Sequence, residues 1–209
     1  MAYITRRSFA RAFVLGGLGL LGTWSQSTAA DNAAAPAANL SEGKSLQLNG
    51  LDGNPHKPLE AGDKKAIVLV FVSPFCPTSN TFMPEINSIA AAYEGKVAFY
   101  LVHSDPEVKM PEALQHASVF EVKTTVLLDK DQALAKLAQA KVTPDSFVIS
   151  PDGVVQYHGR INDLYAGATK KKRQATTKDL RDALDAVLAG KAPATPRTEA
   201  FGCKISVKS

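Results

Sequence analysis

The chain has 209 residues, with 24 basic and 20 acidic side chains and a formal net charge of +4. The first thirty positions hold three arginines and no acidic residue, so residues 31–209 carry 21 basic and 20 acidic side chains. This balance gives no support to a nucleic-acid partner. The 179 residues that follow position 30 are enough for one well-buried domain.

Residues 1–30 have the order of an export signal, with a basic head, an apolar stretch at 12–21 and small residues up to Ala30. The segment Thr5-Arg6-Arg7-Ser8-Phe9 resembles the twin-arginine export motif. The apolar stretch is shorter than the ~20 residues that span a bilayer. We therefore expect cleavage after Ala30 and a periplasmic protein without a stable membrane span. An uncleaved N-terminal anchor is the alternative.

The remaining sequence predicts a linker, one domain and a tail. Residues 31–44 are small and polar and are expected to form a flexible linker. Apolar patterns predict strands at 46–48, 66–72, 96–104, 124–129, 146–150 and 154–160, the last two as a hairpin. Helices are predicted at 78–93, at 111–120, at 131–140 and from a cap at Thr176 or Thr177 to Gly190. Strands that alternate with helices indicate a three-layer α/β domain over 45–190, followed by a tail at 191–209.

Cys76 stands where the buried strand at 66–72 gives way to a helix. The N-terminus of a helix offers partial positive charge and unpaired N–H groups, which stabilise a thiolate. A lowered pKa makes a cysteine nucleophilic near neutral pH. The position therefore favours a reactive thiol at Cys76.

Residues 45–190 resemble the redoxin branch of the thioredoxin-like superfamily, which includes the alkyl hydroperoxide reductase/thiol-specific antioxidant group. The resemblance rests on four segments: Phe71 to Asn80 (FVSPFCPTSN, with the C-P-x-S-N pattern of exported members), Val142 to Pro144, Phe147 to Gly153, and Pro196 to Ile205. It implies a thioredoxin-like fold with a central mixed sheet and helices on both faces. It also implies a proline within the helix, at Pro84, and a cis-proline at Pro144 that faces the thiol.

Two departures from the family pattern bear on the reaction. Ser79 occupies the place of the second cysteine of a local dithiol, so Cys76 lacks a resolving partner three positions away. A peroxidase of this family has a proline where Leu69 stands, and an arginine near the thiolate; Arg160 is the only candidate soon after the strand at 146–150. The resemblance therefore implies thiol–disulfide or peroxide-linked chemistry at Cys76 and weakens the peroxide version. Ser73, Thr78 and Ser79 would supply nearby hydroxyls, and Pro144 would shape the site.

Cys203 is the second of two cysteines. Two cysteines in an exported protein most often pair. If the tail folds back over the domain, Cys203 reaches Cys76 and resolves its sulfenate or mixed disulfide. A static disulfide and two unpaired thiols are the alternatives. The partner would be a thiol or disulfide protein or a peroxide, with no cofactor.

A non-catalytic binding module, for example for copper delivery, is the competing hypothesis. The chain has four histidines, which lack the spacing of a ligand set: His56, His103, His116 and His158. His103 ends a predicted strand and is the histidine expected nearest the site. We predict no metal site.

Overall fold

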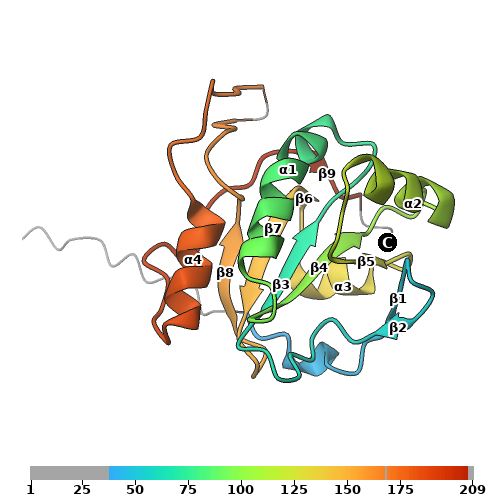
Figure 1. The fold of residues 1–209 in the computed structure, drawn as a ribbon, viewed down its shortest axis with the longest axis horizontal. Helices are drawn as coiled ribbons and strands as arrows, with labels where there is room; N and C mark the ends of the chain where they lie inside the picture. The colour runs from blue at the N-terminus through green and yellow to red at the C-terminus, as the bar shows by residue number, and fades with distance from the viewer. Residues whose placement is uncertain (1–37, 168, 207–209) are drawn as a thin grey trace, which may run out of the picture. The chain divides into compact units, whose positions relative to one another are not determined.

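A mixed seven-stranded sheet forms the centre of the structure, a computed structural model that describes residues 38–167 and 169–206 (Figure 1). Its strands, in spatial order, are β2 (Pro55–His56), β1 (Leu48–Gly50), β5 (Thr125–Leu128), β4 (Ala98–His103), β3 (Ile67–Phe71), β7 (Asp145–Ile149) and β8 (Val155–Gly159). The three strands β3, β4 and β5 are parallel, whereas β1, β7 and β8 run antiparallel to their neighbours. The thioredoxin-like mixed sheet predicted from the sequence is confirmed.

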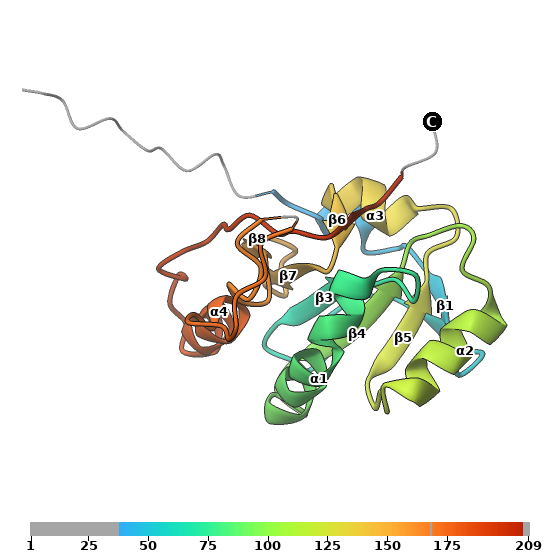
Figure 2. The same ribbon diagram turned by 90° about the horizontal axis from the view of Figure 1, so that it is seen from above.

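Helices cover both faces of this sheet, as Figure 2 shows. Helices α1 (Pro77–Ala92), α2 (Met110–Val119) and α4 (Asp179–Leu188) lie on one face, and the short α3 (Ala133–Ala138) lies on the other. Strand β3 is buried along its whole length because its alternating side chains enter two cores. Val68 and Val70 pack with α1 and α4, while Leu69 and Phe71 pack with α3.

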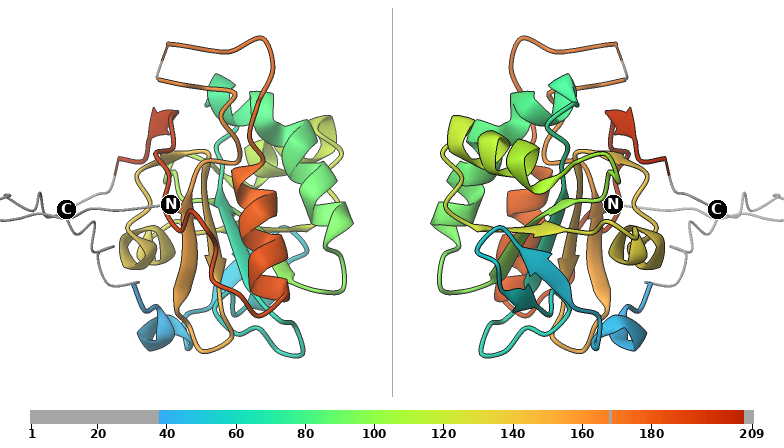
Figure 3. Two further views of the ribbon diagram at one scale, coloured as in Figure 1. Left: turned by 90° about the vertical axis from the view of Figure 1, so that its left-hand side faces the viewer. Right: turned by 90° about the vertical axis from the view of Figure 1, so that its right-hand side faces the viewer.

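A separate pair of short strands joins the tail to the domain. Strand β6 (Val142–Thr143) pairs antiparallel with β9 (Cys203–Lys204), so the C-terminal segment folds back over the domain. β9 lies at the same end of the sheet as the N-terminus of α1 (Figures 1 and 3).

The predicted hairpin and the proline within α1 are both present. β7 and β8 form the hairpin around Gly153, and Pro84 lies inside α1. The helix predicted at 131–140 covers only Ala133–Ala138, because Gln132 and Gln139 both adopt left-handed backbone conformations that bound it.

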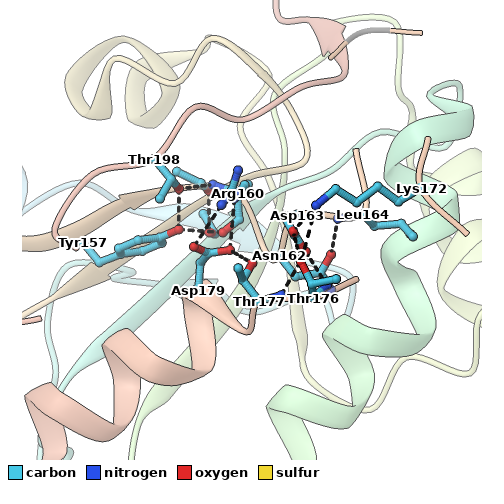
Figure 4. A network of polar contacts seen from close by, with 12 residues as sticks. Tyr157, Arg160, Asn162, Asp163, Leu164, Lys172, Thr176, Thr177, Asp179 and Thr198 are labelled. Atoms are coloured by element: carbon cyan, nitrogen blue, oxygen red, sulfur yellow. Dashed lines mark hydrogen bonds and ion pairs between the residues drawn. The ribbon is translucent and has the colours of Figure 1, made fainter. Parts of the chain in front are cut away.

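The threonine cap predicted for the last helix is wrong. α4 begins at Asp179, and its N-cap residue is Lys178, whose side chain makes no capping hydrogen bond. The hydroxyl of Thr177 donates to the carboxylate of Asp179, and Thr176 bonds to Asp163 through both its amide and its hydroxyl (Figure 4). Nearby carboxylates therefore bind the hydroxyls that the sequence assigned to the cap.

The described part of the predicted linker, residues 38–44, packs on the domain instead of forming a flexible segment. Leu40 is 2% exposed in the core that contains α3, and its amide donates to Gly153 O at 2.8 Å. A short 3₁₀ turn, Ser41–Gly43, follows. The export signal predicted at 1–30 and the linker up to position 37 lie outside the described residues. Within the described ranges, no helix has the length and apolarity needed to cross a membrane.

Candidate active site

Cys76 occupies the N-cap position of α1, five residues after β3 ends at Phe71. The amide of Ser79 donates to Cys76 Sγ at 3.3 Å. Pro77 opens the helix, where the missing N–H of proline leaves no backbone group unsatisfied. The thiol is thus placed at the positive end of the helix, as the sequence predicted.

The serine hydroxyls predicted near the thiol bond to backbone amides of the Cys76 loop and not to the sulfur. Ser79 Oγ accepts from the amide of Ser73 at 3.3 Å, and Ser73 Oγ accepts from the amide of Phe75 at 3.2 Å. Ser79 reaches Cys76 only through its backbone N–H. The hydroxyl of Thr78 takes part in none of the hydrogen bonds found among the described residues.

The Thr143–Pro144 peptide bond is cis, as the resemblance implied. This bond belongs to a loop that lies against Cys76, because Cys76 Sγ donates to the carbonyl oxygen of Thr143 at 3.0 Å. The hydroxyl of Thr143 is buried and has no hydrogen-bond partner within the described part of the chain. Thr143 therefore presents both an acceptor for the thiol proton and a spare donor for a thiolate.

Cys203 lies beside this arrangement. It is the register partner of Thr143 in the β6–β9 pair, and both cysteines are free thiols. Together with Cys76, Cys203 lines a cavity of about 420 Å³ whose lining also includes Asp105, Glu107 and Lys204. The tail thus brings the second sulfur of the sequence to the first, and no disulfide joins them in this structure.

The pKa values of the two thiols are shifted in opposite directions. Burial opposes ionisation of Cys76, but the Cys203 thiol, the Thr143 hydroxyl and the Ser79 amide can all donate to the charged sulfur and outweigh it, so the pKa of Cys76 is lowered. Burial raises the pKa of Cys203 to about 11, and the hydrogen bond with Cys76 and its negative charge act in the same direction. Of the two thiols, Cys76 is therefore the one that ionises first as the pH rises, and Cys203 keeps its proton to higher pH.

Cys76 is buried, and it lines a cavity that tail residues also line. Its residue surface is 1% exposed, yet it belongs to none of the hydrophobic clusters and opens onto the cavity that it shares with Cys203. A partner that reaches Cys76 must enter this cavity.

Specific contacts hold the tail in place. Thr198 Oγ1 bonds to the hydroxyl of Tyr157 at 2.6 Å and accepts from the amide of Arg160 at 3.1 Å. A guanidinium nitrogen of Arg197 lies 2.9 Å from Nδ1 of His158, whose Nε2 contacts the Asp145 carboxylate at 3.0 Å. Because an arginine only donates, Nδ1 of His158 accepts and Nε2 carries the proton toward Asp145.

The Arg160 side chain binds to α4 and not to the thiol cavity. Its guanidinium forms a two-point ion pair with Asp179 of α4, with Nε–Oδ2 at 3.0 Å and Nη2–Oδ1 at 3.2 Å (Figure 4). Arg160 does not line the cavity that holds Cys76. The arginine of the peroxidase pattern therefore has no counterpart here at Arg160.

His103, the histidine expected nearest the site, bonds to the backbone of the segment that joins β3 to Cys76. Nδ1 of His103 bonds to Val72 O at 3.1 Å, and Nε2 is buried without a hydrogen-bond partner in the described ranges. The His103 ring meets that of His116 edge to face at 5.2 Å. Among the described residues, no three His, Cys, Asp or Glu side chains gather as a metal site.

Two residues of the site escaped the sequence analysis. Thr143 had a signal, since it directly precedes the proline predicted to face the thiol. Gln132 had none: its amide donates to Ser104 O and to Ser206 O, both at 2.9 Å, and thereby ties the tail to the cavity wall.

The fold is shared with solved structures of bacterial proteins. A hypothetical protein from Sinorhizobium meliloti aligns with a TM-score of 0.71 and 26% identity over 85% of this chain and 97% of its own. An uncharacterized conserved protein from Geobacillus kaustophilus has a TM-score of 0.69 and 22% identity over 85% and 94% of the two chains. A secreted Mycobacterium tuberculosis disulfide oxidoreductase, homologous to Escherichia coli DsbE, has a TM-score of 0.51 and 20% identity over 71% and 98%.

No curated protein matches the chain. The sequence model of the AhpC/TSA family does match, over residues 35–158. This match covers more than half of the chain and includes Cys76, β3, α1 and the Thr143–Pro144 loop. The chain therefore belongs to the AhpC/TSA family, and its fold is that of the thioredoxin-like redoxins.

Proposed function

We propose that the protein is a thiol–disulfide oxidoreductase in which Cys76 is the nucleophile and Cys203 resolves the mixed disulfide. The observation that carries this proposal is the placement of Cys203 directly across from Thr143, whose carbonyl oxygen binds the Cys76 thiol. The disulfide oxidoreductase from M. tuberculosis, which has the same fold, agrees with this reaction class.

In the first step the Cys76 thiolate attacks one sulfur of a partner disulfide. A bond forms between Cys76 Sγ and that sulfur, the partner S–S bond breaks, and the other partner sulfur leaves as a thiolate. Before the attack, the Ser79 amide, the Thr143 hydroxyl and the Cys203 thiol stabilise the charge on Cys76. The proton released from Cys76 is balanced by the proton that the leaving thiolate takes up.

In the second step Cys203 loses its proton and attacks Cys76 Sγ. A Cys76–Cys203 disulfide forms and the second partner sulfur leaves, so two electrons have passed from the two cysteines to the partner. The negative charge of Cys76 contributes to the raised pKa of Cys203, and this contribution disappears once Cys76 is in the mixed disulfide. Resolution therefore becomes easier only after the first step. The reverse sequence oxidises a partner dithiol.

The test is reaction of the reduced full-length chain with bis(2-hydroxyethyl) disulfide under anaerobic conditions. We expect loss of two free thiols and, in a non-reduced digest, a peptide that joins the segments around Cys76 and Cys203. Cys203→Ser should stop at a mixed disulfide on Cys76, and Cys76→Ser should be inert. Equal inertness of the wild type and Cys76→Ser would overturn the proposal, and Cys76-dependent consumption of hydrogen peroxide without disulfide reduction would favour a peroxidase instead.

We also propose that the protein is exported and works in the periplasm. The order of basic, apolar and small residues in 1–30 supports this, as does the secreted M. tuberculosis protein of the same fold. Cell fractionation with N-terminal sequencing tests the proposal: the expected mature protein begins at Asp31. Arg6→Lys/Arg7→Lys should retain the precursor in the cytoplasm if the twin-arginine pathway exports it, and an unprocessed periplasmic-facing protein would mean an anchor instead.

A further inference from the structure

A second hollow adjoins the thiol cavity on the other side of Phe75. It measures about 360 Å³ and lies between the Cys76 loop and α2, with Phe75, Glu112, His116, Val119 and Phe120 among its lining residues. Phe75 lines both this groove and the cavity that holds the two sulfurs. A polypeptide that places a sulfur at Cys76 can therefore continue over Phe75 into the groove.

The groove presents apolar surface to solvent. Phe75 is 57% exposed and Val119 is 65% exposed, and they are two of the three large apolar side chains exposed in the described part of the chain. Both line this groove, whereas the third, Leu114, does not. Exposed apolar side chains that share one hollow beside a reactive atom are typical of a docking surface.

The wall of the groove is fixed before any partner arrives. Nε2 of His116 donates to Asn80 Oδ1 at 3.0 Å, and Nδ2 of Asn80 donates to Pro74 O at 3.0 Å. The amide of Phe75 donates to Ser73 Oγ at 3.2 Å. These bonds hold the residue before Cys76 outward, so docking on it requires little ordering.

Glu112, which lines the groove, has a carboxylate oxygen without a hydrogen-bond partner in the described part of the chain. Oε2 of Glu112 is buried without a hydrogen bond, and Glu112 takes part in no ion pair among the described residues. A carboxylate oxygen shielded from water is stabilised by a cation. A lysine or arginine side chain complements both the apolar and the acidic part of the groove. Its methylene stem packs on Phe75 and Val119, and its charged end reaches Glu112.

We propose that this groove docks the partner protein through a lysine or arginine that flanks the partner's reacting cysteine. The inference rests on the proposed oxidoreductase function and specifies its partner. Asp105 and Glu107 line the thiol cavity together with one basic residue, Lys204, so acidic side chains outnumber basic ones there and favour the same sign of charge in the partner.

The test compares three peptides that differ at one position. Each carries a single cysteine, blocked as a mixed disulfide with 2-mercaptoethanol, and a neighbouring lysine, norleucine or glutamate. The rate constant for their reduction by the full-length protein is measured at a fixed ionic strength of about 150 mM, where long-range charge effects are screened. We expect the lysine peptide to react about tenfold faster than the glutamate peptide, with norleucine between them.

Variants then assign the preference to the groove. Glu112→Gln should abolish it, and Val119→Ser should slow the lysine and norleucine peptides alike. Glu121→Gln removes the same charge from an exposed residue just beyond α2 and should keep the preference. Equal rates for all three peptides, or equal loss of preference in Glu112→Gln and Glu121→Gln, would overturn the docking proposal. Bis(2-hydroxyethyl) disulfide does not need the groove, so failure to reduce it would instead indicate that the oxidoreductase function is wrong.

Discussion

The carbonyl oxygen of Thr143 accepts a hydrogen bond from Cys76 Sγ at 3.0 Å, although 67 positions separate the two residues. The same threonine pairs with Cys203 in β6–β9 and holds a hydroxyl that lacks any partner in the described ranges. One residue thus contacts the protonated thiol, holds a donor in reserve for the thiolate and positions the second sulfur. The reactivity of Cys76 should depend on Thr143 more than on the serines that surround it.

Thr143→Val keeps the shape of the side chain and removes its hydroxyl. The Cys76 thiolate loses one donor, so the pKa of Cys76 should rise. A hydrogen bond of about 1 kcal/mol corresponds to about a fivefold change in an equilibrium constant. We therefore expect the rate of Cys76 alkylation by iodoacetamide at pH 7 to fall about fivefold in a Cys203→Ser background, and its pH profile to move to higher pH.

Thr169→Val, at an exposed position, is the matched control and should leave the profile in place. An unchanged profile in Thr143→Val would mean that the hydroxyl does not reach the sulfur.

Gly202→Ala should separate the two cysteines. A Cβ atom at Gly202 would lie 1.9 Å from the carbonyl oxygen of Thr143, which is backbone and cannot rotate away. Strand β9 must therefore move off β6 and take Cys203 with it. Because misplacement by about 1 Å can slow a positioned reaction by about 100-fold, we expect formation of the Cys76–Cys203 disulfide to slow by at least about tenfold.

The control is Gly167→Ala, whose Cβ would meet only the Lys170 side chain at 3.8 Å or beyond. Disulfide formation is followed by mass spectrometry after addition of oxidised glutathione. A Gly202→Ala protein that forms the disulfide at the wild-type rate would show that β9 does not position Cys203.

The sequence predicted the part of the site that local patterns determine. The apolar run of β3, the helical spacing after Cys76 and the proline at position 144 each have a short-range signal, and together they place the thiol at the strand–helix junction. The resemblance to redoxins added the cis bond at Pro144.

The remainder of the site depends on contacts between distant segments. Cys203 reaches Cys76 because β9 pairs with β6, and a two-residue strand has no periodicity from which pairing can be read. The threonine cap of α4 failed for a similar reason, since the acceptor that binds Thr176 is Asp163, thirteen positions away. Local propensity was outweighed there by tertiary hydrogen bonds.

The buried histidine behind the Cys76 loop should make stability depend on pH. Burial, followed by the neighbouring His116, lowers the pKa of His103 to about 4 from an ordinary value of 6.5. Between these two values the unfolded chain binds a proton that the folded chain does not, so the free energy of unfolding should decrease as the pH falls from about 6.5 to about 4. The pKa difference corresponds to a loss of about 3 kcal/mol.

Urea denaturation at several pH values measures this dependence. His103→Gln should weaken it across that window and leave the part that comes from His116, whose pKa burial also lowers. His56→Gln, at a partly exposed position, should change it less. A wild-type stability that stays constant from pH 6.5 to 4 would contradict the buried neutral state of His103.

Arg160→Ala distinguishes a structural arginine from one that serves the thiolate. The substitution leaves the Asp179 carboxylate, which is 11% exposed, without its two-point partner at the start of α4. Loss of charge-assisted hydrogen bonds to a largely buried carboxylate should lower the free energy of unfolding by about 2 kcal/mol. Asp179→Asn added to Arg160→Ala should recover part of that loss, because the amide needs no cation.

The alkylation rate of Cys76 in Arg160→Ala should stay within about twofold of the wild type, since Arg160 does not line the thiol cavity. A tenfold fall in that rate with unchanged stability would instead place Arg160 at the sulfur and return the protein to the peroxidase pattern of its family.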